Sequence, residues 1–178
     1  IWSNEIARCP KRQEVLKSFD HVFLNCQSSV SALQSLIKRP CEYFPPGVDC
    51  VRFSPHPTRP LRSIDLCNLG RRSPVTHAAL LDYSKHNDFL YIYDTLDSKD
   101  RVKDPAEHRM LLGNLMKRSR YFIANRAKIN RESDTGGQDE LGFRFFEGAA
   151  GGAVLLGDPP DGPAFKEHFG WQDSVIRI

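Results

Sequence analysis

The feature that most constrains the fold of this chain is an alternation of short β-rich apolar runs with longer segments of helical periodicity. Seven runs are predicted strands: His21–Cys26, Cys41–Phe44, Ile64–Leu69, Phe89–Tyr93, Tyr121–Ala124, Ala153–Leu156 and Ser174–Ile178. Four segments have the apolar spacing of helices: Ser28–Lys38, Val75–Lys85, Pro105–Arg118 and Leu141–Ala150. This alternation is typical of a parallel sheet with right-handed helical crossovers. The sequence therefore predicts an α/β fold, with a Rossmann-like parallel sheet flanked by helices.

Local signals mark the starts of three of these helices. Ser28 or Ser29 is placed to cap the first helix, Pro74 leads into the second, and Pro105 suits the first position of the third. Helix boundaries are therefore expected close to these residues.

A proline-rich stretch interrupts the alternation. Five prolines between Pro45 and Pro60 leave a segment that we expect to hold no helix. We interpret residues 53–62 as an interdomain linker, residues 1–52 as the end of a preceding domain, and residues 63–178 as a second domain. The chain starts without Met and stops on an apolar run, so we expect both ends to be cuts, with the second domain truncated at its C-terminus.

Composition and charge exclude several classes of function. The net charge of +3 comes from scattered Lys and Arg residues, which argues against a nucleic-acid partner. The longest uncharged apolar run, from Gly148 to Gly157, is far shorter than the roughly 20 residues that span a bilayer, so no integral membrane segment is expected. Five cysteines without a C-x-x-C pair indicate neither a disulfide framework nor a zinc site, and favour a cytoplasmic location.

The turn after the strand Ile64–Leu69 is the first candidate for a ligand site. Ligands on open parallel sheets bind outside the carboxyl ends of the strands. Gly70, Arg71 and Arg72 lie at such an end, directly before a helix start, where backbone N–H groups, the helix dipole and guanidinium groups favour a phosphate. An ordinary turn with solvated arginines is the alternative interpretation.

A second candidate follows the strand Tyr121–Ala124. A long polar loop from Asn125 to Gln138 leads to two acidic residues and then to a glycine-rich helix, and loops of this length are usually functional or mobile. The small residues of the helix indicate close approach of its backbone to another group. Arg144 and Glu147 are three residues apart on one helical face, and we expect the Gly70 turn to face them. Tight packing of the helix on the sheet, with a surface ion pair between Arg144 and Glu147, is the alternative.

This second segment resembles the E-x7-E signature of retaining GT-B glycosyltransferases of the glycosyl transferase group 1 family. In that register Asp139 and Glu147 are the two acids, and Gly142 and Gly152 are the glycines of the motif. The sequence departs from the pattern at the first acid, which is aspartate where the family has glutamate.

Two further segments resemble the same family. Residues 44–55 are similar to its P-x-G-V-D…F-x-P linker, and the turn at Gly70 and Arg71 is similar to the Gly-Arg turn that opens its donor-binding domain. The lysine that usually follows this turn is absent, and Arg72 is the nearest substitute.

The resemblance implies a glycosyltransferase of the hexosyltransferase kind, in which this chain binds the donor. The donor is a nucleotide-sugar, the acceptor is unknown, and no cofactor is expected. The sequence has no D-x-D triplet, so no metal ion is expected at the diphosphate. Most of the acceptor domain is missing, and the fragment by itself is expected to be inactive.

The same resemblance implies roles for individual residues. Asp139 faces the donor sugar and Glu147 accepts hydrogen bonds from the ribose, and these two are the expected catalytic residues. Arg71 and Arg72, beside Gly70, neutralise the diphosphate, and Asn125 contacts the base. The remaining expected donor-binding residues are Glu140, Leu141, Gly142 and Arg144.

Two other classes of function stay open. One is a non-catalytic nucleotide-sugar-binding module, or pseudo-enzyme, of the same fold. The other is an epimerase or dehydrogenase on a doubly wound sheet, which needs a G-x-G-x-x-G turn after a strand. The sequence contains no such turn, which argues against this second class.

Overall fold

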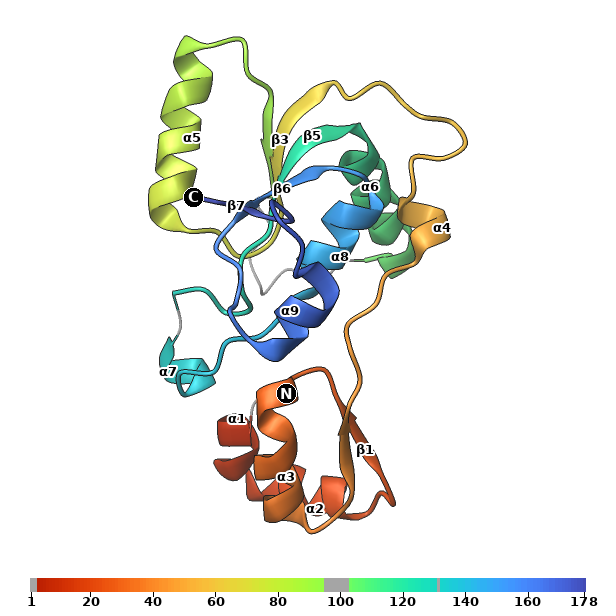
Figure 1. The fold of residues 1–178 in the computed structure, drawn as a ribbon, viewed down its shortest axis with the longest axis vertical. Coiled ribbons are helices and arrows are strands. Elements are labelled where there is room, and N and C mark those ends of the chain that lie inside the picture. Colours follow the sequence, from red (N-terminus) through yellow and green to blue (C-terminus); the bar gives the residue numbers. More distant parts are fainter. Residues whose placement is uncertain (1–2, 95–102, 131) are drawn as a thin grey trace. The chain divides into compact units, whose positions relative to one another are not determined.

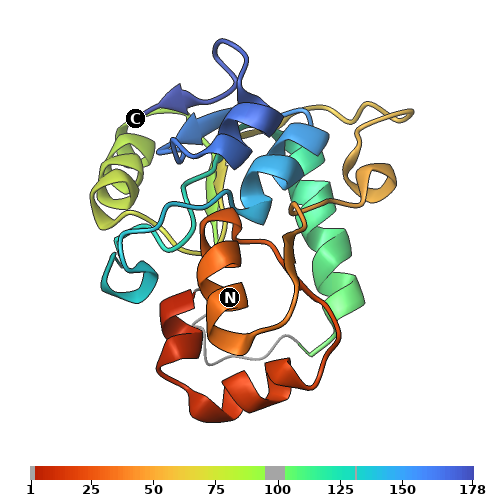
Figure 2. The same cartoon turned by 60° about the horizontal axis from the view of Figure 1, so that its bottom comes forward.

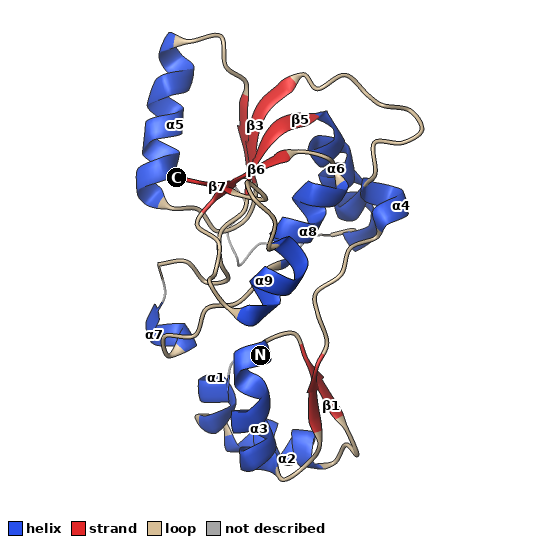
Figure 3. Ribbon diagram, viewed as in Figure 1, coloured by secondary structure: helices blue, strands red, loops and turns tan. Residues whose placement is uncertain are grey.

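Strands and helices alternate along much of the chain in a computed structural model that describes residues 3–94, 103–130 and 132–178 (Figures 1 and 3). The strands are β1 (Val22–Leu24), β2 (Cys41–Tyr43), β3 (Ile64–Asn68), β4 (Tyr91–Tyr93), β5 (Ser119–Ile123), β6 (Val154–Gly157) and β7 (Ile176–Arg177). All seven predicted strands are present, and their ends differ from the prediction by no more than two residues.

The four predicted helices are also present, together with shorter ones that were not predicted. The predicted helices are α3 (Val30–Ile37), α5 (Pro74–His86), α6 (Pro105–Arg118) and α8 (Phe143–Ala150). The others are α1 (Ser3–Ala7), α2 (Pro10–Lys17), the 3-10 turn η1 (Gln27–Ser29), α4 (Cys50–Phe53), α7 (Glu132–Thr135) and α9 (Pro163–Phe169). Each of these is at most about two turns long, which is too short for an apolar period to stand out in the sequence.

Side-chain caps explain two of the predicted helix starts, and a third start lacks one. The side chain of Asp104 accepts hydrogen bonds at the start of α6, and Ser73 accepts one at the start of α5. Ser29 is the N-cap residue of α3, as predicted, but its side chain makes no capping hydrogen bond. The hydroxyls of Ser28 and Ser29 instead donate to side chains of the segment 126–141.

The proline-rich stretch does hold a short helix, contrary to the prediction. Asp49 Oδ1 accepts a hydrogen bond from Arg52 N at 3.0 Å and so caps α4, a four-residue helix between the two groups of prolines. Asp49 sets the start of this helix, and Pro55 limits its extension beyond Phe53, because the residue before a proline disfavours the helical conformation.

The described chain forms two compact units, each built from several segments. Unit 1 contains residues 1–46, 126–141 and 160–171, and unit 2 contains residues 47–125, 142–159 and 172–178. The division into residues 1–52, 53–62 and 63–178 stays a prediction, because compactness does not test which segments fold independently.

The core of unit 2 is a five-stranded parallel sheet with the strand order β4-β3-β5-β6-β7. Helix α5 lies on one side of this sheet, and α6 and α8 lie on the other (Figures 1 and 2). Phe122 of β5 and Leu155 of β6 are buried beneath α8. The predicted α/β architecture is therefore confirmed: unit 2 is a parallel sheet flanked by helices, compatible with a Rossmann-like fold.

Unit 1 has a smaller core around the parallel pair β1 and β2. Its buried apolar side chains come from α1, α3 and the two strands: Ile6, Leu24, Leu33, Ile37 and Cys41. Lys128, from the segment 126–141, forms an ion pair with Glu5 of α1. The segment 126–141 therefore contacts the first helix of unit 1.

Gly148 explains why α8 contains small residues. A Cβ at this position would lie 2.5 Å from Leu155 Cδ2 and 2.7 Å from Phe122 Cδ1, both on the sheet. The backbone of α8 therefore approaches the sheet closely at Gly148. This agrees with the alternative interpretation, in which the small residues serve tight packing of the helix on the sheet. A methyl group cannot be added here without displacing core side chains.

We predict that Gly148→Ala lowers the free energy of unfolding by about 1–3 kcal/mol, because it overpacks the interface between α8 and the sheet. Urea denaturation of the full chain measures the change. Gly47→Ala is the matched control, since a Cβ at Gly47 meets nothing within 4 Å. Equal stability of the two variants would contradict tight packing at Gly148.

Candidate functional site

The strand order of unit 2 creates one topological switch point, between β3 and β5. After β3 the chain crosses to β4 on one side, and after β5 it crosses to β6 on the other. The carboxyl ends of β3 and β5 therefore lie side by side while their following segments diverge. In open α/β sheets ligands bind in the crevice at such a point.

The turn after β3 requires glycine at position 70. Gly70 has a φ of +85°, a left-handed conformation that side chains disfavour. A Cβ there would lie 3.4 Å from Arg144 Nη2 of α8. The expectation that the Gly70 turn faces this helix is therefore confirmed.

Arg72 and the N–H of Gly70 are both engaged by Asp94, which follows β4. Gly70 N donates to Asp94 Oδ2 at 2.8 Å, and Arg72 Nη1 donates to Asp94 Oδ1 at 2.5 Å and to its backbone oxygen at 2.6 Å. The Arg72 guanidinium also lies 5.5 Å from the centre of the Tyr93 ring. Arg71, in contrast, is exposed. The turn thus already holds one carboxylate.

Glu147 is a buried carboxylate between two guanidinium groups. Its residue is only 3% exposed. Arg109 Nη1 of α6 donates to Oε1 at 2.5 Å, and Arg144 Nη1 donates to Oε2 at 2.6 Å. The Arg144–Glu147 ion pair of the alternative interpretation exists, but its carboxylate is buried and is shared with Arg109, while the two arginine side chains are partly exposed. These three side chains, the Arg109–Glu147–Arg144 triad, have a net charge of +1.

Asn125 joins the ends of β5 and β6. Its Oδ1 accepts a hydrogen bond from Asp158 N at 2.9 Å, and a Cβ at Gly142 would lie 3.9 Å from the Asn125 backbone oxygen. Gly142 is the N-cap of α8. The N-terminus of α8 therefore lies beside the carboxyl end of β5, where its dipole favours negative charge.

The other predicted site residues lie in unit 1, where they line a cavity of about 520 Å³. Asp139, Glu140 and Leu141 form one wall of this cavity. Glu140 Oε1 accepts hydrogen bonds from Ser28 N at 2.9 Å and Ser28 Oγ at 2.5 Å. The structure thus gathers the predicted residues into two groups: Gly70, Arg72, Asn125, Gly142, Arg144 and Glu147 in unit 2, and Asp139 to Leu141 in unit 1.

Sequence reasoning missed Arg109 and Asp94. Arg109 is one of several charged residues in the helical pattern of Pro105–Arg118, and its pairing depends on how α6 and α8 pack. Asp94 directly follows a predicted strand at the carboxyl edge of the sheet. This position at the carboxyl edge was the only feature of the sequence that could have marked Asp94 as a site residue.

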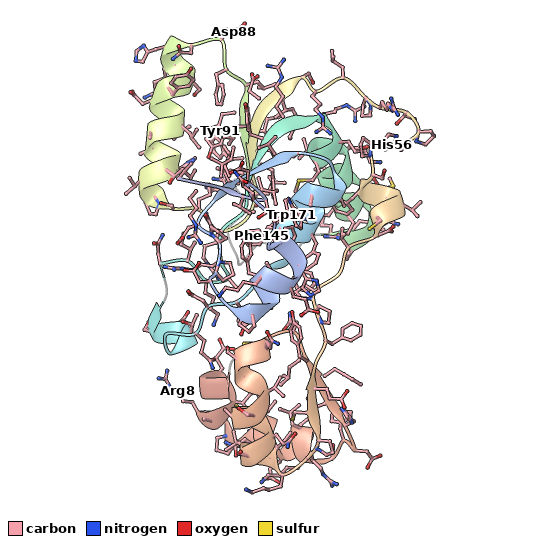
Figure 4. All side chains as sticks on the ribbon, in the orientation of Figure 1. Arg8, His56, Asp88, Tyr91, Phe145 and Trp171 are labelled. Carbon is pink, nitrogen blue, oxygen red and sulfur yellow. The ribbon has the colours of Figure 1, made fainter. Side chains whose placement is uncertain are left out.

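Two residues near the Gly70 turn, Cys67 and His77, have shifted pKa values. Burial raises the pKa of the Cys67 thiol to about 11, so this thiol is protonated at neutral pH and is a poor nucleophile. The pKa of His77, whose Nδ1 lies 2.8 Å from Tyr91 Oη, is lowered first by burial and then by the charge of Arg72. Tyr91 lies between α5 and the sheet (Figure 4). His77 is therefore a neutral partner in this packing.

The described residues contain neither a cluster of metal ligands nor a helix that could span a membrane. Residues 3–94, 103–130 and 132–178 contain no group of three or more His, Cys, Asp or Glu side chains that could hold a metal ion. No helix within these ranges has the length and apolar character needed to cross a membrane.

Comparison with known proteins gave no match. No family model matches the chain, and neither does any curated protein or solved structure.

We predict that Glu147→Gln lowers the free energy of unfolding by about 1.5–3 kcal/mol, the scale of a lost hydrogen bond between charged groups. The amide keeps one acceptor oxygen but turns an N–H₂ group toward the second guanidinium. Urea denaturation measures the loss. Glu14→Gln, which breaks an exposed pair with Lys17, is the control and is expected to cost about 0–1 kcal/mol. A Glu147→Gln variant as stable as this control would contradict a buried carboxylate held by two arginines.

Proposed function

We propose that this chain is the donor-binding part of a glycosyltransferase, which transfers a sugar from a nucleotide-sugar to an acceptor. The observation that carries the proposal is the convergence of the Gly70 turn, Arg144 and the buried Glu147 at the switch point of a parallel sheet. The resemblance of residues 139–152 to the E-x7-E signature supports the same assignment.

The nucleotide is bound in unit 2, at the carboxyl ends of β3 and β5. The exposed Arg71 and the positively charged triad meet the diphosphate, close to the N-terminus of α8. Each oxygen of Glu147 accepts a hydrogen bond from one arginine, and the ribose reaches this buried carboxylate when the partly exposed Arg109 and Arg144 side chains move aside. Asn125 contacts the base with its side-chain N–H₂ group. Arg72 shapes the turn through its ion pair with Asp94 and is available to the diphosphate when a phosphate displaces that carboxylate.

For the transferred sugar, the E-x7-E resemblance implies Asp139 as the partner, with its carboxylate accepting hydrogen bonds from hydroxyl groups. Asp139 lines the cavity of unit 1, and its side chain is 43% exposed. A carboxylate that is partly exposed on the wall of a cavity is available to a polar ligand, since it keeps free lone pairs.

We predict that the full chain binds a nucleoside diphosphate without divalent metal, because arginines take the place of a metal ion at the diphosphate. A thermal-shift panel of UDP, GDP, ADP and CMP with their sugars, run in EDTA, measures this as an increase in melting temperature. A shift that requires manganese would contradict metal independence. The absence of a shift with every nucleotide would end the proposal.

We predict that Arg71→Ala weakens binding of the preferred nucleoside diphosphate by about 1.5–3 kcal/mol and leaves binding of the matching nucleoside unchanged. Calorimetric titration of both ligands measures the difference. Arg8→Ala removes the same charge at an exposed position of unit 1 and is the matched control (Figure 4). Equal losses for both ligands in Arg71→Ala would indicate damaged folding and not a lost phosphate contact.

One observation favours a second candidate, a non-catalytic nucleotide-sugar-binding module of the same fold. The Asp94 carboxylate occupies the N–H of Gly70, which in the first proposal is next to the diphosphate. Turnover separates the two candidates: the full-length protein hydrolyses or transfers sugar from the bound nucleotide-sugar only if it is an enzyme.

A further inference from the structure

Helices α4 and α6 lie side by side in unit 2 (Figure 1), with a surface hollow of about 350 Å³ between them. We call this hollow the α4–α6 groove. Its lining residues are Asp49, Val51, Arg52, Met110, Asn114 and Lys117. All six belong to unit 2, so the groove lies within a single compact unit.

Close packing fixes the walls of the α4–α6 groove. A Cβ at Gly113 of α6 would lie 3.3 Å from the backbone oxygen of Arg52, so the backbones of α4 and α6 approach closely here. Phe53 of α4 is fully buried, and the centre of its ring lies 4.8 Å from the Arg109 guanidinium of α6. The groove is therefore formed before a partner binds, which lowers the entropic cost of binding.

Two of the lining residues are exposed apolar side chains. Val51 of α4 is 90% exposed, and Met110 of α6 is 46% exposed. Apolar side chains that are exposed singly are normal, but two that line one hollow form a patch, which indicates an interaction surface. Methionine is common on binding surfaces because its side chain is flexible and polarizable.

The polar part of the lining contains a cation without a partner. Lys117 is half-buried, and within residues 3–94, 103–130 and 132–178 its ammonium group has no hydrogen bond or ion pair. The charge of Arg52 is offset by Asp49, whose Oδ2 lies 3.6 Å from Arg52 Nε. Two cations and one anion give the lining a net charge of +1, which is carried by Lys117. The side-chain amide of Asn114 is likewise unbonded within the described chain.

The spacing of these residues on α6 specifies what can bind. Met110, Asn114 and Lys117 are at positions i, i+4 and i+7, which lie on one face of a helix. The rise of the helix separates Met110 from Lys117 by about 10 Å. A partner therefore needs an apolar side chain and an anion about 10 Å apart, as residues i and i+7 of a helix or i and i+3 of an extended segment are.

The open shape of the groove favours a protein over other partners. A small-molecule site buries about 70–90% of its ligand, whereas Val51 stays so exposed that this lining cannot enclose one. Nucleic acids and anionic membranes are bound by clusters of Lys and Arg, and the described lining has one unpaired cation. An anchor side chain and a carboxylate of another protein match the groove instead.

We propose that the α4–α6 groove is a docking site for an acidic, apolar segment of a partner protein. An apolar side chain of the segment packs against Val51 and Met110, and a carboxylate about 10 Å further along pairs with Lys117. The amide of Asn114 hydrogen-bonds to the segment between these two contacts. Docking here requires no nucleotide, so it is tested whether or not the proposed function holds.

The test begins with a display library of random peptides that is selected on the full chain. The affinities of the selected peptides are then measured by fluorescence anisotropy. We expect enrichment of peptides in which an apolar residue is followed by an acidic residue at i+7 or i+3. Enrichment of basic peptides, or no enrichment at all, would overturn the proposal.

Val51→Glu shows whether the selected peptides bind in the groove. It replaces an apolar contact with a negative charge that repels an acidic peptide, and is expected to weaken binding at least tenfold. Val75→Glu is the matched control, because Val75 is 80% exposed and is the second residue of α5, as Val51 is of α4. Binding that both variants weaken equally, or that neither weakens, would place the peptides elsewhere and overturn the proposal.

A charge swap tests the role of Lys117. Lys117→Glu is expected to weaken binding of an acidic peptide about tenfold, and replacing the acidic residue of the peptide by lysine is expected to restore it. Lys85→Glu reverses the same charge at an exposed position in the last turn of α5 and is the control. A loss that the swapped peptide does not restore would contradict the pairing with Lys117.

A second copy of this chain is the alternative occupant of the groove. Sedimentation velocity of the full chain is expected to show no self-association that depends on Val51. A dimer that Val51→Glu dissociates would assign the groove to a second copy and overturn the proposal.

Discussion

The Arg109–Glu147–Arg144 triad, with its buried carboxylate, is the interaction on which the candidate site in unit 2 depends. Its carboxylate comes from the middle of α8, one guanidinium from the first turn of that helix, and the other from α6. A buried carboxylate is costly unless its charge is paired, and here each oxygen has its own cation. Arg144 is held on one side by Glu147 and on the other lies against Gly70, so the packing of two helices sets the position of a guanidinium at the sheet edge.

The positions of the strands and main helices could be predicted because local sequence patterns determine them. Apolar runs indicate the seven strands, and helical periods indicate the four main helices. The caps Ser73 and Asp104, each followed by a proline, determine where α5 and α6 begin. Ser28 and Ser29 show the limit of such reasoning. Their hydroxyls bind Glu140 and Gln138, about 110 residues later, and no local pattern reveals a partner at that separation.

The same limit applies to the site. Gly70, Arg144 and Glu147 were identified because glycine turns and small-residue helices leave a signal in the sequence, and the structure places them together. Arg109 and Asp94 left no comparable signal, since an arginine on a helix and an aspartate after a strand are common. Their roles follow from the packing of α6 on α8 and of β4 beside β3, which are tertiary facts.

Asp94 has a consequence for how affinity at the Gly70 turn should be understood. The N–H of Gly70 is already bonded to a carboxylate, and Arg72 is already paired with the same group. A phosphate arriving at this N–H would exchange one anion for another, and the measured free energy would be the difference between two charged hydrogen bonds. The displaced carboxylate would need new partners, from water or from another cation. Affinity at this turn therefore depends on the new interactions of the displaced Asp94 carboxylate as much as on the hydrogen bonds that the phosphate forms.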